Sequence, residues 1–436
     1  MTTTSAPRGR VAAWVRFVLD NSLLLLAGAV AAMVWANLSP ASYAAMLHAP
    51  LLANPYFGVA VDGAVVSSAA ADGVVSGVVT VGGGGKIIDL HYLVNDIFMA
   101  LFFALAGREV WHALLPGGPL SRAKQAATPM LCAVGGMIGP IGLYLTGVTA
   151  FGRWDDLARG WAVPTATDIA FSYFVARLIF GKGHAAVAFL LLLAIVDDAL
   201  GLMILAIFYP QGEVAPAWLL LSVAAVGVCV LLYTLRRRHF LWFLLLAGPL
   251  SWTGFAWAGL HPALGLLPIV PMLPHAHLHT WRAGWNFVTP RDAEKFEVWM
   301  KPPVEIILCL FGLLNAGVLL TGPAGHDLTA AGLVFGGLVV GKPLGIFLTA
   351  LLATKLGLGL AAGLRRRDLL VVGCVAGIGF TVAIFVATVA FPYTTDASKA
   401  LQSAAKLGAL ASFASALVAW LVARIVGVKR HDEATR

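Results

Sequence analysis

Four ionisable residues lie deep inside long apolar runs of this 436-residue sequence: Asp168, Asp197, Asp198 and Lys342. Ionisable side chains are costly inside a lipid bilayer, and they mark ion or substrate paths there by default. Carboxylate oxygens are the ligands that hard cations prefer, and they also bind protons. The four residues therefore predict a membrane site at which a cation and protons compete.

The adjacent aspartates carry the strongest signal, because apolar residues flank Asp197 and Asp198 for more than a helical turn on both sides. Neighbouring helix positions point about 100° apart. One carboxylate can therefore face an ion path while the other faces a neighbouring helix. Two carboxylates in a low-dielectric site cannot easily both ionise without a cation. We expect both to bind sodium and protons; the alternative is a helix cap or a surface pair.

Two interrupted helices are predicted near these aspartates. Pro164 removes a backbone donor, and Thr167 and Asp168 are residue types that begin helices. Gly377 and Gly379 permit a second interruption in another apolar run. Paired interruptions in the two halves of a transporter point to its transport site. Taken singly, the first motif fits an ordinary helix start and the second fits a close-packed glycine surface.

Lys342 lies about half-way along an apolar run, between Gly341 and Pro343. A lysine at that depth needs a negative partner, either an aspartate or the negative ends of broken helices. The alternative is a lysine whose long side chain reaches the membrane surface.

The elements that position these residues are about twelve transmembrane helices. A span needs about 20 apolar residues, and the runs suggest spans at 18–38, 93–114, 126–147, 161–180, 184–209, 216–235, 239–257, 260–274, 299–319, 328–354, 368–392 and 403–427. The interruptions fall in the fourth and eleventh spans, and spans 3–5 and 10–12 would form an inverted repeat. We thus predict one all-α, polytopic membrane domain over 1–436, with its spans within 18–427.

Composition and charge support this architecture, since 60% of the residues are hydrophobic and only 11% are charged. Soluble domains carry about a quarter charged residues. Basic residues gather in alternate loops, which predicts that both termini, including the tail 428–436, are cytoplasmic. The net charge of +8 therefore indicates membrane orientation, and no nucleic-acid partner is expected. We expect the first apolar run to be retained as a span, the alternative being a cleaved signal peptide.

The longest predicted external loop covers 39–91 and is rich in Gly, Ala and Val. The alternating segment at 74–81, followed by Gly82 to Gly85, favours an external β-hairpin. The alternative is a flexible linker of small residues.

At these residues the sequence resembles the NhaA-type sodium/proton antiporter family. The similarity runs from about Asp96 to Lys406, and its most specific segments are Asn95–Asp96, Gly135–Ile138, Pro164–Phe171, Ala194–Gly201, Asn315–Val318, Gly341–Ile346, Gly377–Ile384 and Ala405–Gly408. The resemblance implies electrogenic export of sodium or lithium in exchange for protons, by alternating access and with activation at alkaline pH. It also implies a bacterial inner membrane location.

The resemblance further implies the residue roles. Asp198 and Asp197 would bind the cation and protons, Lys342 would pair with Asp197 or with helix ends, and Thr167 and Asp168 would lie where the two interrupted helices cross. We expect sodium, protons, lipid and a homodimeric copy of the chain as partners, with no cofactor.

The departures from the family pattern concern regulation. Arg108 and Ala113 flank the retained Glu109 where the family has leucine and a second glutamate, and Glu305 is an unexpected carboxylate. Arg108 is expected to repel cations at a cytoplasmic funnel, and so to alter the pH dependence or lower the cation affinity. Further candidates for pH regulation are His261 and Glu297. His275, His277 and His279 suggest a pH-responsive inner loop, and an ordinary solvated loop is the favoured alternative for them.

Two other functions deserve weight: a passive cation channel and a scaffold that does not transport. A channel needs a continuous polar path, and interrupted helices at a mid-membrane site suit alternating access better. The retained ionisable residues argue against a scaffold. An enzyme is not expected, because the sequence has no nucleophile–base set and no nucleotide motif.

Overall fold

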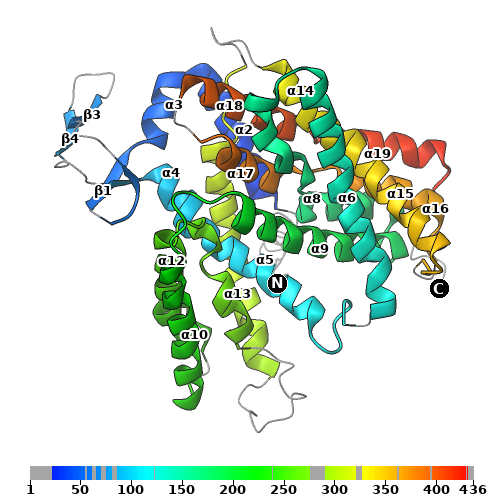
Figure 1. Ribbon diagram of the computed structural model, residues 1–436, viewed down its shortest axis with the longest axis horizontal. Coiled ribbons are helices and arrows are strands. Elements are labelled where there is room, and N and C mark those ends of the chain that lie inside the picture. Colours follow the sequence, from blue (N-terminus) through cyan, green and yellow to red (C-terminus); the bar gives the residue numbers. More distant parts are fainter. Residues whose placement is uncertain are drawn as a thin grey trace, which may run out of the picture. The chain divides into compact units, whose positions relative to one another are not determined.

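The computed structural model describes residues 22–54, 56–60, 65–69, 75–80, 86–121, 123–237, 239–274, 290–320, 327–360, 363–392, 395–428 and 430. The described chain is mostly helical, and its strands are confined to the N-terminal part that is coloured blue in Figure 1. This confirms the predicted helical architecture of a multi-pass membrane protein.

The helices follow the predicted spans closely. The α-helices are α2 (Leu23–Leu38), α3 (Pro40–Leu47), α4 (Leu90–Tyr92), α5 (Met99–Leu114), α6 (Ala123–Ala150), α7 (Trp154–Leu157), α8 (Ile169–Phe180), α9 (Ala185–Phe208), α10 (Leu219–Thr234), α11 (Phe240–Trp242), α12 (Gly248–Trp257), α13 (Pro290–Asn315), α14 (Leu328–Gly336), α15 (Lys342–Lys355), α16 (Arg366–Ala376), α17 (Phe380–Ala390), α18 (Asp396–Ala411) and α19 (Ala414–Ile425). The 3-10 helices are η2 (Ala158–Thr165), η3 (Pro216–Trp218), η5 (Pro262–Leu264) and η6 (Leu267–Met272), and the π-helices are η1 (Leu93–Phe98), η4 (Phe243–Ala247) and η8 (Gly337–Gly341).

Within the described residues, seven helices are long and apolar enough to cross a membrane, or nine if each of two bent helix pairs forms one span. The predicted first and eighth spans appear as shorter apolar helices, Leu23–Leu38 and Pro262–Met272. The total of twelve spans stays a prediction.

The chain divides into two compact units. The first contains the described parts of Ala106–Tyr209 and Thr321–Arg436, and the second contains those of Leu23–Leu105 and Pro210–Leu320. Asp168, Asp197, Asp198 and Lys342 all belong to the first unit.

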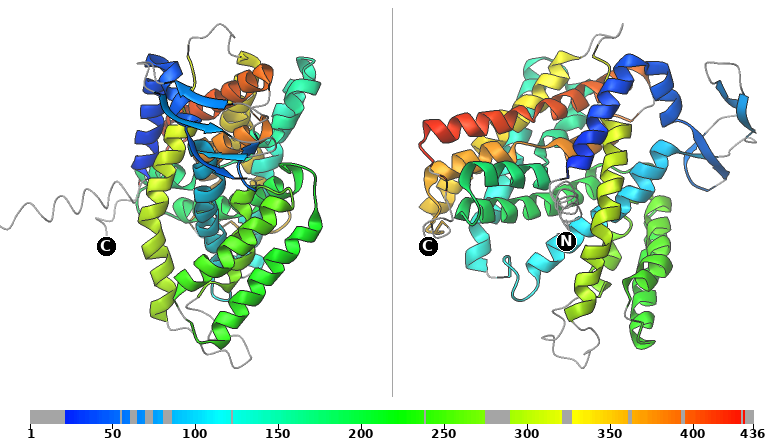
Figure 2. Two further views of the ribbon diagram at one scale, coloured as in Figure 1. Left: turned by 90° about the vertical axis from the view of Figure 1, so that its left-hand side faces the viewer. Right: turned by 180° about the vertical axis from the view of Figure 1, so that it is seen from behind.

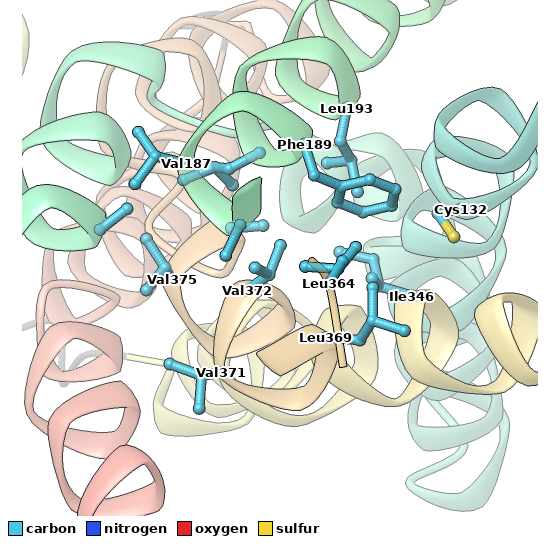
Figure 3. Close-up of a cluster of buried hydrophobic side chains, with 14 of the residues drawn as sticks. Cys132, Val187, Phe189, Leu193, Ile346, Leu364, Leu369, Val371, Val372 and Val375 are labelled. Carbon is cyan, nitrogen blue, oxygen red and sulfur yellow. The ribbon is translucent and has the colours of Figure 1, made fainter. Parts of the chain in front are cut away.

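An apolar core holds the first unit together around α6, α9, α15 and α16. Figure 3 shows Phe189 and Leu193 of α9 close to Ile346 of α15 and Leu369 of α16, and all four side chains are buried. Each large aliphatic or aromatic side chain buried in this way stabilises the fold by about 1.5–3 kcal/mol. This core supports the N-terminal half of α9 up to the aspartate pair.

In the second unit, α2 packs against α13, and Figure 2 shows the blue α2 alongside the yellow-green α13. The contact depends on small residues, since a side chain at Gly28 would strike the Cys309 carbonyl and one at Gly312 the Leu25 carbonyl. The helices α10 and α12 form a second packed pair.

The segment between α3 and α4 contains two small antiparallel sheets. In the first, β5 (Lys86–Asp89) pairs with both β1 (Pro50–Asn54) and β2 (Val59–Ala60). In the second, β3 (Val65–Ala69) pairs with β4 (Val75–Thr80), and Val66 lies opposite Val79. The alternating segment at 74–81 therefore supplies one strand, β4, of a two-stranded sheet. The location of this sheet outside the membrane stays a prediction.

Candidate functional site

The first interrupted helix is formed by η2 and α8. The axes of Trp154–Thr165 and Ile169–Phe180 differ by 52°. Asp168 is the N-cap of α8, and its Oδ1 accepts a hydrogen bond from the Phe171 amide at 3.2 Å. An N-cap carboxylate satisfies a donor that the helix itself leaves unpaired.

The second interruption separates α16 from α17, whose axes differ by 50°. Gly377 and Gly379 are needed there because the backbone of other segments approaches closely. A Cβ atom at Gly377 would lie 2.5 Å from the Leu338 carbonyl oxygen, and one at Gly379 would lie 2.8 Å from the Ala166 carbonyl oxygen.

The two interruptions meet through hydrogen bonds. The Asp168 amide donates to the Ile378 carbonyl at 2.7 Å, and the Thr167 hydroxyl oxygen lies 3.1 Å from the Ala376 carbonyl oxygen. In return, Asp168 Oδ2 accepts from the Thr381 amide at 3.3 Å and from the Thr381 hydroxyl. Each interruption thus satisfies backbone groups of the other, inside an apolar run where unpaired groups are expensive.

Three serines complete this polar network, and our reading of the sequence did not identify them. Ser172 donates to the Val375 carbonyl at 3.0 Å, Ser415 donates to the Cys374 carbonyl at 2.8 Å, and Ser412 accepts from the Gly379 amide at 3.2 Å. All three are buried. Their presence within apolar runs was the only signal in the sequence that could have pointed to them. That signal is weak, because many serines in such runs only form hydrogen bonds with the backbone of their own helix.

Asp197 projects from α9 to this crossing and is fully buried. Its Oδ2 atom lies 2.9 Å from Lys342 Nζ and accepts a hydrogen bond from the Thr167 hydroxyl at 2.8 Å. Its other oxygen, Oδ1, is buried and has no hydrogen-bond partner among the described residues. One oxygen of Asp197 thus meets two donors, and the other is available to a further donor or a cation.

Lys342 is fully buried, and its ammonium group also donates to the Thr165 carbonyl beside the first interruption. It follows directly on the π-helix η8, and its own amide donates to the Gly337 carbonyl five residues earlier. Single π turns often occur at functional sites. This turn sets the direction in which Lys342 leaves its helix.

Asp198 has a different environment from its neighbour. It is half-buried, and no hydrogen bond or ion pair to another described residue involves its carboxylate. Gly201, three residues further along the same helix face, has open space where a Cβ atom would lie. Asp198 is therefore the more accessible of the two carboxylates.

The donor set suits a small hard cation. The described residues contain no cluster of three His, Cys, Asp or Glu side chains of the kind that binds a transition metal. They do bring two adjacent carboxylates together with hydroxyl and carbonyl oxygens, which are the ligands that hard cations prefer. A proton can occupy the same carboxylate oxygens.

A fifth buried charge, Lys406, is placed inside α18 and is only 7% exposed. No hydrogen bond or ion pair joins Lys406 to another described residue.

The candidates for pH regulation are dispersed. Arg108 is fully buried. This differs from the expectation, because a residue that repels cations at a funnel should be accessible. Glu109, in contrast, is exposed. His261, in the second unit, is buried with its Nδ1 atom 3.8 Å from Asp96 Oδ1. Glu297 belongs to α13, but its side chain lies outside the described residues, as do His275, His277 and His279.

Comparison with known proteins gives one consistent family. The model of the family described as Na+/H+ antiporter 1 matches residues 16–423. The chain is 47% identical to the Na(+)/H(+) antiporter NhaA of Jannaschia sp. (strain CCS1), over 95% of this chain and 98% of that protein. Identity to the NhaA proteins of Desulfitobacterium hafniense (strain DSM 10664 / DCB-2) and Geobacter sulfurreducens is 40% and 39%, with 95% of this chain covered in each case and 97% and 98% of those proteins. The interrupted helices and buried charges described above thus belong to a member of the NhaA-type Na+/H+ antiporter family.

Proposed function

We propose that this protein is an electrogenic secondary antiporter that exports sodium or lithium ions in exchange for protons. Its site is the mid-membrane pair Asp197 and Asp198, and Thr167, Asp168 and Lys342 support that pair. The observation that carries the proposal is the buried contact of Lys342 with one oxygen of Asp197. The other oxygen of Asp197 has no partner among the described residues, and the carboxylate of Asp198 beside it is accessible.

The chemistry follows from competition for the same oxygens. An entering cation first meets Asp198, because that carboxylate is accessible, and then Asp197 Oδ1. A second positive charge weakens the attraction of Asp197 for Lys342, so cation binding releases the ammonium group. When the cation leaves, protons and Lys342 neutralise the aspartates again, since an uncompensated buried carboxylate is too costly. Alternating access then exposes the neutralised site to the opposite side.

The proposal includes location and regulation. The protein would lie in the bacterial inner membrane with both termini in the cytoplasm, as a homodimer in contact with lipid. Exchange of more than one proton per sodium ion would make transport electrogenic and driven by the membrane potential. Arg108, Glu109, His261 and Glu297 would set the pH at which the antiporter becomes active.

Sodium-dependent proton release from everted membrane vesicles tests the function. Wild-type vesicles should release protons when sodium or lithium is added, and Asp198→Asn should abolish the release. The matched control is Asp155→Asn, which neutralises an exposed aspartate of α7 and should retain the activity. Full activity in Asp198→Asn would refute the site, and sodium flux without proton movement would indicate a channel.

A further inference from the structure

Two glycine pairs face each other where α6 packs against η8 and α15. Gly135 and Gly139 lie four residues apart on α6, and Gly341 and Gly345 lie four residues apart around Lys342. We call these four residues the glycine seam. Glycines with this spacing allow the backbones of two membrane helices to approach closely.

The glycine seam leaves no room for a side chain. A Cβ atom at Gly345 would lie 2.0 Å from the Gly135 carbonyl oxygen, and one at Gly139 would lie 2.3 Å from the Gly341 carbonyl oxygen. At Gly341 a Cβ atom would lie 2.7 Å from Pro140 Cα. The obstacles are backbone atoms, so a larger residue has to move one helix away from the other.

Lys342 is directly coupled to this contact. It follows Gly341, and its stem passes Gly136, where an added Cβ atom would lie 3.8 Å from Lys342 Cε. The same Cβ atom would lie 2.9 Å from Ile346 Cγ1. The π-helix η8 ends at Gly341, directly before Lys342. Any shift of this helix against α6 therefore moves the ammonium group.

We propose that the glycine seam is a positioning device for Lys342, which holds its ammonium group on Asp197 Oδ2 and the Thr165 carbonyl and keeps it off Asp197 Oδ1. The buried Oδ1 atom, which has no hydrogen-bond partner among the described residues, then remains available to the cation. A seam residue acts through Lys342 and does not itself contact the ion. This inference rests on the proposed exchange at Asp197 and Asp198.

A displaced Lys342 has opposite effects on the two halves of the exchange. The cation competes with a weaker partner for Asp197, so sodium binds more tightly. In the sodium-free site, the displaced Lys342 neutralises the aspartates less well. The conformational change that exposes this site to the opposite side of the membrane is therefore slower. General damage to the fold would instead weaken binding or reduce the amount of folded protein.

The test compares Gly345→Ala and Gly136→Ala with Gly142→Ala in the purified full-length protein. Gly142 lies on the same helix α6 and has open space at its Cβ position. Sodium-dependent thermal stabilisation reports the apparent Kd for sodium, and exchange in proteoliposomes reports the maximal rate. Gly345→Ala and Gly136→Ala should each lower the apparent Kd for sodium and the maximal exchange rate several-fold. The control Gly142→Ala should change neither. If Gly345→Ala does not fold, Gly136→Ala decides, because its Cβ position meets side-chain atoms of Ile346 and Lys342 and not backbone, so the helix carrying Lys342 has to shift less.

A double-mutant cycle separates positioning from packing. In a Lys342→Met background, Gly136→Ala and Gly345→Ala should leave the apparent sodium Kd within about twofold, because the group they displace is absent. The same change of Kd in both backgrounds, or a lower rate at unchanged Kd, would overturn the inference. Loss of exchange in the wild-type protein would instead refute the proposed function.

Discussion

Asp197 receives two donors on a single oxygen while its other oxygen meets none in the part of the chain that the structure describes. This asymmetry distinguishes it from an ordinary buried ion pair. A buried pair that loses one partner costs about 3–5 kcal/mol, because a charge remains uncompensated. A cation on the second oxygen lowers that cost. The residue geometry therefore suits a site that changes partners and does not simply stabilise the fold.

Lys406 gives a prediction about stability. The elements packed against α18 are α14, α17 and η2, and none of them contains Asp or Glu. Gln402 bonds the Phe391 carbonyl and Ser412 bonds the Gly379 amide, so Lys406 lies between two contacts with α17 and its flanking residues. Lys406→Met should keep or raise the melting temperature, because replacing buried charges is often neutral or stabilising by about 1–4 kcal/mol.

The melting temperature in detergent checks this, with Lys399→Met on the same helix as the control. A clearly lower melting temperature for Lys406→Met would show that the charge has a partner that stabilises it. Exchange measured on the same samples shows whether the antiporter needs the charge for transport.

Arg108 gives a prediction about ion affinity and pH. Replacing it by leucine, the residue of the family pattern, removes a buried positive charge from the unit that contains the aspartates. Arg108→Leu should lower the KM for sodium several-fold, because like charges repel strongly where water is excluded, and should shift the pH of half-maximal exchange. Initial rates in everted vesicles between pH 6 and 9 measure both.

Arg159→Leu is the control for Arg108→Leu, since Arg159 is exposed in the same unit. Identical KM values and pH profiles for Arg108→Leu and the wild type would exclude Arg108 from regulation.

At the scale of elements, the structure has bends of 52° and 50° at the places where the sequence predicts interruptions, but the sequence does not predict how the two bends cooperate. Pro164, Gly377 and Gly379 are local signals, because they act on their own backbone. The reciprocal bonds between Asp168 and the residues after Gly377 join segments that are 213 residues apart, and no local pattern predicts such a pairing.

Gly379 gives a prediction at this scale. Gly379→Ala places a methyl group 2.8 Å from the Ala166 carbonyl and 2.7 Å from Leu338 Cδ2. The strain should destabilise the protein by about 1–3 kcal/mol and slow exchange, because the two interruptions are forced apart. Thermal unfolding and vesicle exchange measure these effects.

Gly332→Ala in α14 is the control for Gly379→Ala, because its Cβ position meets open space. If both substitutions changed stability equally, the crossing of the interrupted helices would not depend on close approach at Gly379.

At the scale of the whole molecule, the predicted twelve-span topology can be tested by labelling. In a variant without its four cysteines, Lys182→Cys and Glu213→Cys each introduce one exposed thiol in successive loops. Two loops joined by the single span α9 must lie on opposite sides. A membrane-impermeant maleimide should label position 213 in intact spheroplasts and position 182 only in everted vesicles.

Permeabilised membranes, in which both positions should react, provide the control for this labelling. Reaction of both thiols from the same side would contradict the topology and the cytoplasmic location of the termini.

The sequence by itself determined the class of protein, the approximate places of its helices and the burial of Asp168, Asp197 and Lys342, but not that of Arg108 and Lys406. These are local properties, because the length of an apolar run and the cost of a charge within it do not depend on distant residues. Only the tertiary structure decided that Lys342 and Thr167 both contact one oxygen of Asp197 and that Thr381 bonds Asp168. It also decided that glycines of α6 and α15 lie against each other beside Lys342. Such contacts depend on distances between remote segments, and differences of a few tenths of an ångström decide them.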